Sequence, residues 1–155
     1  MSVPVTVRRG DHADRGFVHD LGARSAASSV SPVREARYDD VLEAFARLVE
    51  FVFERRHEVL VAEEQGARIG FLLLLFDVPD EVTLTQQAFV AYTAVEPHAR
   101  GRGVGRALLE AAELQARAAG LRYMSLMVTE ENAPARTLYE RAGFVVERRM
   151  MTKPL

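Results

Sequence analysis

The sequence has no cysteine, and Lys153 is its only lysine. Without cysteine the chain can form no disulfide, no cysteine-ligated metal site and no catalytic thiolate, and we expect no metal. The longest apolar run, IGFLLLLF at residues 69–76, is too short to span a bilayer, which needs about 20 residues. The net charge of −2 over 155 residues gives no reason to expect a nucleic-acid or membrane partner, and a cytoplasmic location fits this composition.

Hydrophobic periodicity predicts one α/β domain over residues 1–155, built on a single mixed, mostly antiparallel sheet. The strands are expected at residues 3–9, 58–64, 67–77, 88–95, 121–128 and 144–151. The four helices are expected from Asp11 to about Arg24, from Asp39 or Asp40 through Val52, from Val104 to Gly120, and from Asn132 to near Gly143. The element order is therefore β-α-α-β-β-β-α-β-α-β, with about six strands.

A cluster of glycine and arginine lies where the predicted strand 88–95 gives way to a helix, in the stretch HARGRGVGRALL at residues 98–109. The first turn of a helix has amides without intrahelical partners, and the helix dipole adds positive charge there. Glycine lets the backbone approach an anion, and arginine adds attraction and bidentate contacts. The stretch therefore predicts a phosphate-binding loop, although a solvated surface loop would have the same composition. It lacks the lysine of a Walker loop and has Arg106 where a dinucleotide-binding loop has glycine.

Two blocks of the sequence resemble the GNAT acyltransferase superfamily. The first is Arg100-x-x-Gly103-x-Gly105, preceded by TAVEP and followed by RALL. The second is NAPARTLYERAGF at residues 132–144, and the final MTKPL is also similar to endings in that family. The resemblance implies a sheet whose central strands, 88–95 and 121–128, splay apart to admit coenzyme A.

The resemblance also implies acetyl-CoA as co-substrate and a role for each matching residue. The loop amides would hold the pyrophosphate, and the end of strand 88–95 would pair with the pantetheine arm and polarise the thioester through an N–H near Ala94 or Val95. Tyr139 matches the tyrosine that protonates the departing thiolate in that family. The implied cofactor-binding residues are Thr93, Ala94, Val95, Arg100, Gly101, Arg102, Gly103, Val104, Gly105, Arg106 and Asn132. From the residues alone, a helical tyrosine is more often a packing residue and an asparagine before a helix is more often only a cap.

The sequence departs from the family where relatives carry a general base. Phe89 and Met127 stand at the two places where a glutamate would be expected. The remaining candidates for a base are Glu96, His98, Glu130 and Glu131, each of which is also typical of a solvated surface.

The acceptor is expected to be a small-molecule or peptide amine, attacked directly without a covalent enzyme intermediate. The resemblance is also compatible with a homodimer. A non-catalytic acyl-CoA sensor on the same fold is the alternative that the missing base leaves open. An RNA-binding role for the Arg-Gly cluster is disfavoured, because the cluster has no interleaved aromatic residues.

Overall fold

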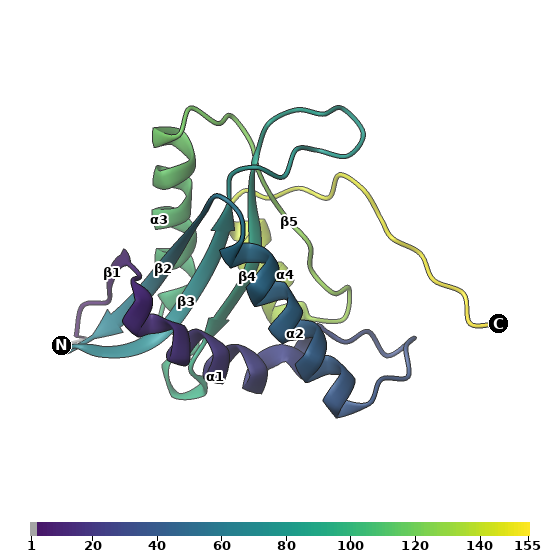
Figure 1. Cartoon of the computed structure of the whole chain (residues 1–155), viewed down its shortest axis with the longest axis horizontal. Coiled ribbons are helices and arrows are strands. Elements are labelled where there is room, and N and C mark those ends of the chain that lie inside the picture. The colour runs from purple at the N-terminus through teal and green to yellow at the C-terminus, as the bar shows by residue number, and fades with distance from the viewer. Residues whose placement is uncertain (1–2) are drawn as a thin grey trace.

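The computed structural model describes residues 3–155 as one five-stranded sheet with helices on both faces (Figure 1). The strands follow one another across the sheet in chain order. They are β1 (Thr6–Arg9), β2 (His57–Glu64), β3 (Ala67–Leu75), β4 (Ala88–Val95) and β5 (Met124–Leu126). All neighbouring pairs are antiparallel except β4 and β5, which are parallel. The prediction of a mixed, mostly antiparallel sheet is confirmed, with five strands where about six were expected.

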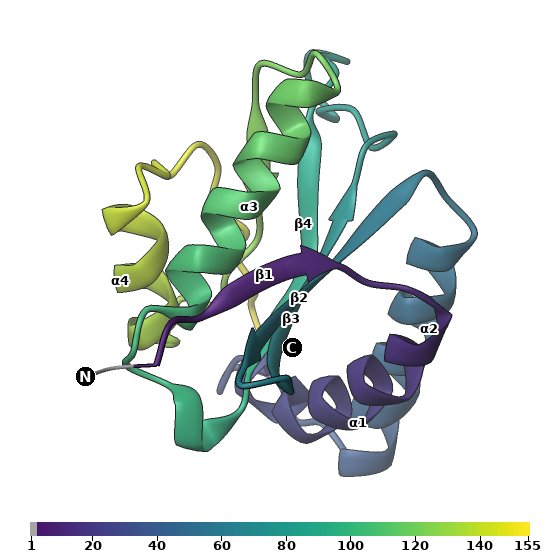
Figure 2. The ribbon, with the colours of Figure 1, turned by 90° about the vertical axis from the view of Figure 1, so that its left-hand side faces the viewer.

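Four α-helices cover the sheet, two on each face. They are α1 (Arg15–Ser25), α2 (Tyr38–Phe53), α3 (Val104–Ala118) and α4 (Ala133–Arg141). Figure 2 shows α3 and α4 on one face and α1 and α2 on the other. Each face has its own apolar cluster, one built around Leu72, Val104 and Leu108 and the other around Leu21, Val49 and Phe71. None of the helices within residues 3–155 is both long and apolar enough to cross a bilayer.

Local sequence signals account for several of these boundaries. Gln65 and Gly66 join β2 to β3 with φ of 50° and 76°, as a two-residue hairpin turn requires. Asp11 caps a short 3₁₀ helix at residues 12–14 that leads into α1. The prediction that Asp39 or Asp40 caps α2 is wrong, because Arg37 occupies the N-cap of this helix. The two aspartates lie in its first turn, where their charge favours the helix dipole.

The end of the chain differs most from the sequence-based prediction. The strand expected at 121–128 is reduced to the three residues of β5, and residues 144–155 form no regular secondary structure. Val145 and Met151 are 87% and 91% exposed. A strand needs a neighbour with free backbone groups along its length. Because β5 is so short, the segment 144–151 has no such neighbour among the described strands.

Asp14 joins the N-terminal strand to the rest of the sheet. Its side chain, 1% exposed, accepts hydrogen bonds of 2.8 and 2.9 Å from Arg8 on β1 and of 2.8 Å from Arg68 on β3. It also accepts from the Asp11 amide at 2.8 Å. These bonds, those of Arg8 foremost, hold the pKa of the Asp14 carboxyl well below its usual range.

Asp14→Asn is expected to lower the free energy of unfolding by about 3 kcal/mol, because it leaves two arginines without their shared carboxylate. The depressed pKa gives stability that is present above the ordinary aspartate pKa near 4 and is lost as pH falls below it. Urea unfolding at pH 7 and pH 3 measures both effects. The difference in unfolding free energy between wild type and Asp14→Asn should shrink at pH 3, and an undiminished difference would contradict this account of Asp14.

Candidate functional site

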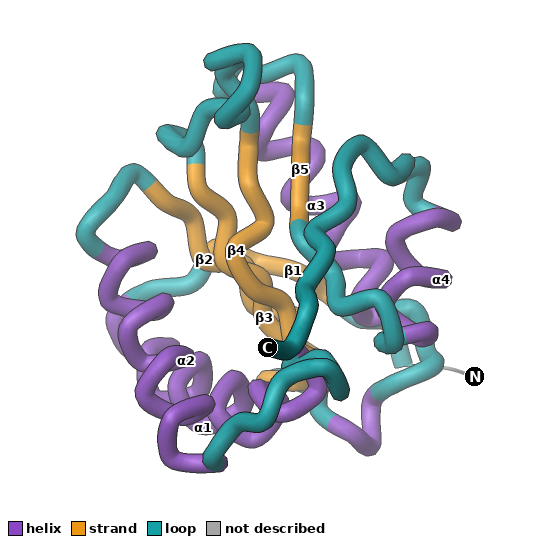
Figure 3. Tube along the Cα trace, turned by 90° about the vertical axis from the view of Figure 1, so that its right-hand side faces the viewer, coloured by secondary structure: helices purple, strands orange, loops and turns teal. Residues whose placement is uncertain are grey.

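The parallel pairing of β4 with β5 stops halfway along β4. The paired residues are Ala88 with Met124, Phe89 with Ser125, and Val90 with Leu126. On its other side β4 continues to pair with β3 as far as Val95. Figure 3 shows β5 at the edge of the sheet, with β4 continuing past it. The last five residues of β4, residues 91–95, therefore have no strand on the side where β5 would continue.

The hydrogen bonds to β3 show which groups of β4 face this open side. Glu96 donates its N–H to the carbonyl of Ile69 at 2.8 Å. Successive residues of a strand direct their backbone groups alternately to its two sides. Ala94 therefore faces β3, whereas Thr93 and Val95 face the open side. The Thr93 hydroxyl donates instead to the Phe71 carbonyl at 3.0 Å.

The glycine-rich loop follows β4 after the 3₁₀ helix Pro97–Ala99 and has unused amides. Gly101 and Gly103 have φ of 73° and 84°, values that other residues adopt only with strain. The first backbone bond of α3 runs from Ala107 to the Gly103 carbonyl. Among the described residues, the amides from Gly101 to Arg106 donate to no backbone or side-chain acceptor. Only the Arg100 amide is engaged, at 3.4 Å to Pro97.

The arginine side chains of the loop are already paired with the protein. Arg100 donates to the Val95 carbonyl at 3.1 Å and so fixes the loop to the end of β4. Arg102 contacts Glu64 at 2.9 Å, and Arg106 contacts Glu110 at 2.8 Å. All three arginines lie at the surface. The positive charge here is thus partly offset by carboxylates, and the unpaired amides are the distinctive feature of the loop.

Helix α4 is held against the start of α3 by a close approach at Gly105. A Cβ atom on Gly105 would lie 2.8 Å from Cδ2 of Leu138. Asn132 caps α4 by accepting from the Ala135 amide at 3.4 Å. Tyr139 lies one residue after Leu138 and contacts Phe144 edge-on, with ring centroids 5.9 Å apart. The close approach therefore brings α4, with Asn132 at its N-cap and Tyr139 within it, against the first turn of α3.

The Tyr139 hydroxyl forms no hydrogen bond with other residues of the described chain. Burial raises the pKa of its phenol, and the neighbouring Tyr92 raises it further. The phenol is therefore protonated at neutral pH and has a proton available for a bound molecule.

Two of the carboxylates considered as a general base are engaged in ion pairs. Glu96 contacts Arg24 at 2.8 Å, and this contact, foremost its hydrogen bond, lowers the pKa of Glu96. Glu130 lies 3.5 Å from Arg136. Within residues 3–155, no three His, Asp or Glu side chains are arranged to hold a metal ion.

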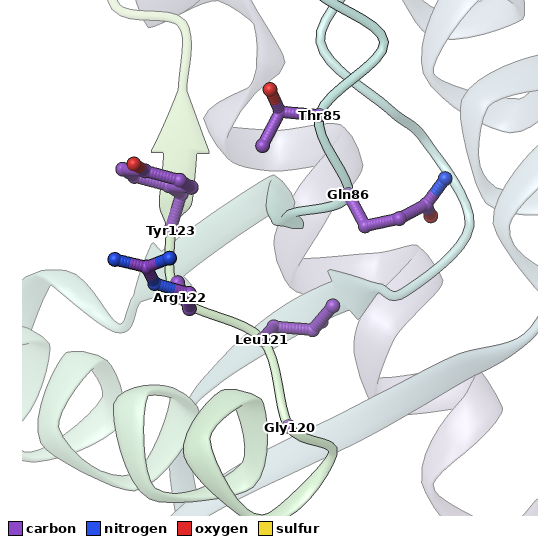
Figure 4. Close-up of a pocket in the computed structure, with 6 residues that line it drawn as sticks. All are labelled: Thr85, Gln86, Gly120, Leu121, Arg122 and Tyr123. Carbon is purple, nitrogen blue, oxygen red and sulfur yellow. The ribbon is translucent and has the colours of Figure 1, made fainter.

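A pocket of about 270 Å³ lies away from the loop, beside the C-terminal end of α3 (Figure 4). Thr85 and Gln86 line one side, and Arg122 and Tyr123 line the other. Gly120 in its wall follows the last turn of α3, whereas the loop precedes the first turn. This pocket is separate from the opening beside β4.

The acetyltransferase (GNAT) family model matches residues 23–144, most of the chain. The chain belongs to the GNAT acetyltransferase family. Among proteins similar to this GNAT chain is Bacillus subtilis YhfO, named as an uncharacterized N-acetyltransferase, with 36% identity over 86 residues. That match covers 56% of the chain and 57% of YhfO, so it spans little more than half of either protein.

Solved structures share the GNAT fold over the whole chain. A Pyrococcus furiosus protein, provisionally named an acetyl transferase, superposes with a TM-score of 0.83 at 26% identity and covers 98% of this chain and 100% of its own. The aminoglycoside N-acetyltransferase AAC(6')-Iy, solved with CoA, has a TM-score of 0.72 at 18% identity, covering 100% of this chain and 97% of its own. The predicted fold is thereby confirmed.

The structure also places in the open segment of β4 a residue that the sequence did not single out, Tyr92. It lies beside Thr93 in the strand AFVAYTAV, whose other residues are apolar. The tyrosine hydroxyl in this strand is the signal that could have found it.

Gly105→Ala is expected to show an energetic coupling of at least about 1 kcal/mol with Leu138→Ala, because the new methyl group meets Leu138 only when its side chain is present. Urea unfolding of the two single variants and the double variant measures the coupling. Gly16→Ala is the matched control, since a Cβ there meets nothing within 4 Å. Additive effects at Gly105 and Leu138 would show that the two helices do not touch at this point.

Proposed function

We propose that this chain transfers an acetyl group from acetyl-CoA to an amine. The single observation that carries the proposal is the free edge of β4 next to the unused amides of the loop before α3. An extended molecule with amides at one end and a diphosphate at the other would satisfy both sets of groups. Coenzyme A has this form.

The loop would bind the diphosphate through its main chain. The unused amides run from Gly101 through the loop into the first turn of α3, a 15-residue helix whose dipole favours negative charge. Arg100, Arg102 and Arg106 add positive charge around them. Thr93 and Val95 would pair with the pantetheine arm on the open side of β4, with Ala94 between them and Asn132 across the gap. The N–H of Val95 would polarise the thioester carbonyl, as an oxyanion-hole donor does.

The reaction would be a direct displacement. The neutral amine nitrogen forms a bond to the thioester carbon, the carbon–sulfur bond breaks, and the sulfur leaves as a thiolate. Tyr139 would give its proton to that thiolate, the amine would lose one proton to solvent, and the Tyr139 phenolate would take one proton back from solvent. Holding both reactants in line supplies a large part of the rate. No ionisable side chain is needed as a nucleophile.

The acceptor is proposed to be a small-molecule or peptide amine. The aminoglycoside enzyme with the same fold is named for a small amine substrate, and this supports the class without naming a compound. A sensor that binds acyl-CoA without turnover is the second candidate, because Glu96 and Glu130, two of the carboxylates that could act as a base, are held in ion pairs with arginines.

Tyr139→Phe is expected to lower kcat by about 100-fold, the lower end of the range for general-acid catalysis, because a thiolate leaves readily. An acceptor panel with acetyl-CoA, read as free thiol, measures kcat, and calorimetry measures the acetyl-CoA dissociation constant, which should not change. Tyr123→Phe is the control, since Tyr123 is 55% exposed and lines the separate pocket.

Each contrary outcome has a distinct meaning. Wild-type protein that binds acetyl-CoA but acetylates no acceptor would favour the sensor. Wild-type protein that gives no heat with acetyl-CoA would contradict both candidates. Turnover that Tyr139→Phe leaves unchanged would remove Tyr139 from the reaction.

A further inference from the structure

The carboxylate of Glu96 joins the end of β4 to helix α1. Both of its oxygens accept hydrogen bonds from the Arg24 guanidinium, Oε1 at 2.8 Å from Nη2 and Oε2 at 3.1 Å from Nη1. Arg24 lies in the last turn of α1, 72 residues earlier in the chain. A guanidinium that meets both oxygens of one carboxylate fixes the direction of the contact as well as its length. The two elements are therefore clamped together at this point.

Arg24 is held in place for this contact by its own helix. Its Nε and Nη2 donate to Oδ2 of Asp20, one turn earlier in α1, at 3.1 and 2.8 Å. The Arg24 side chain is 45% exposed and that of Glu96 is 17% exposed. A partly exposed ion pair contributes little to stability, because ordering two long side chains offsets most of the gain. A pair supported on both sides is better suited to fixing geometry.

The peptide that joins Val95 to Glu96 is the part of the chain that this pair holds. Its carbonyl, that of Val95, accepts from Nε of Arg100 at 3.1 Å. Its N–H, that of Glu96, donates to the Ile69 carbonyl on β3 at 2.8 Å. The Glu96 side chain adds a third attachment, to α1. Three elements, namely β3, α1 and the glycine-rich loop, thus meet at the peptide directly after the Val95 N–H.

Helix α1 is itself fixed on the sheet by its buried face. Val18 and Leu21 are 0% exposed and share an apolar cluster with Ala94 of β4. Side chains alternate between the two faces of a strand, so Glu96, two residues after Ala94, is directed to the face that α1 covers. The packed helix therefore gives Arg24 a rigid base from which to hold the end of β4.

We propose that Arg24 and Glu96 are positioning residues, whose ion pair sets the direction of the Val95 N–H toward the thioester carbonyl. This inference rests on the proposed function and adds to it two residues that act through the backbone of Val95. An oxyanion-hole donor stabilises the transition state when it is aimed in advance at the place where negative charge develops. With both oxygens engaged by a guanidinium, Glu96 orients the end of the strand and does not serve as the general base.

Arg24→Gln and Glu96→Gln are each expected to lower kcat about 10-fold, less than the roughly 100-fold cost of removing an oxyanion-hole donor, because the N–H remains but is aimed less well. The acetyl-CoA dissociation constant should stay within about two-fold of wild type, because the loop amides are intact. The double variant should lose no more than either single variant, since each breaks the same ion pair. Arg24→Lys, which keeps the charge but has one nitrogen, should fall between wild type and Arg24→Gln. Steady-state kinetics with the acceptor panel and calorimetry with acetyl-CoA measure these values.

Two further variants serve as controls. Arg117→Gln should leave kcat unchanged, because Arg117 donates to Glu113 at 2.7 Å in an ion pair at the far end of α3 from the loop. Asp20→Asn removes the support of Arg24 without breaking its contact with Glu96, so it should lower kcat less than Arg24→Gln does. A thermal unfolding midpoint within about 2 °C of wild type shows that a lowered kcat does not arise from misfolding.

An NMR measurement tests the direction of the Val95 N–H without an acceptor. Acetyl-CoA has a thioester carbonyl and CoA has none, so the Val95 amide of the ¹⁵N-labelled wild type should shift differently with the two ligands. This difference should shrink in Arg24→Gln and persist in Arg117→Gln.

The outcomes separate this inference from the function beneath it. An active wild type whose kcat is unchanged in Arg24→Gln would overturn the inference and leave the acetyltransferase proposal standing. A Glu96→Gln variant that loses far more activity than Arg24→Gln would also overturn it, because that result would assign Glu96 the part of a base. If the wild type binds acetyl-CoA without turnover, the proposed function fails, and an undiminished NMR difference in Arg24→Gln would separately overturn the inference.

Discussion

The end of pairing between β4 and β5 at Val90 is the constraint on which the rest of the site depends. Backbone groups buried without partners are costly, so a strand that loses its neighbour must find other hydrogen bonds. Arg100 satisfies the Val95 carbonyl at the end of β4. Thr93 and the Val95 N–H remain facing the opening. The free amides of the loop follow along the chain, after the 3₁₀ helix Pro97–Ala99.

The two faces of the sheet bring different elements to β4. Helices α3 and α4 bring the loop, Asn132 and Tyr139 to one face, and the close approach at Gly105 fixes the spacing of the two helices. On the other face, the bulge at Ala91 turns Tyr92 toward the cluster of α1 and α2.

Much of this arrangement was predictable from local sequence, and the rest depends on contacts between distant residues. The hairpin at Gln65-Gly66, the cap at Asn132 and the positive φ at Gly101 and Gly103 each follow from residue types at adjacent positions. The face taken by Tyr92 depends on a bulge in the pairing with β3, which no local pattern reveals. The strand expected at 144–151 failed for a similar reason, because its formation depends on the length of β5.

The most direct test of the central claim is a titration of ¹⁵N-labelled protein with CoA, followed by amide chemical shifts in NMR spectra. The account predicts that the largest changes fall on Gly101 to Arg106 and on Thr93 and Val95, with Ala94 and the residues of the pocket at Gly120 changing less. Saturable binding with its largest shifts outside these two segments, or no shifts at all, would contradict it.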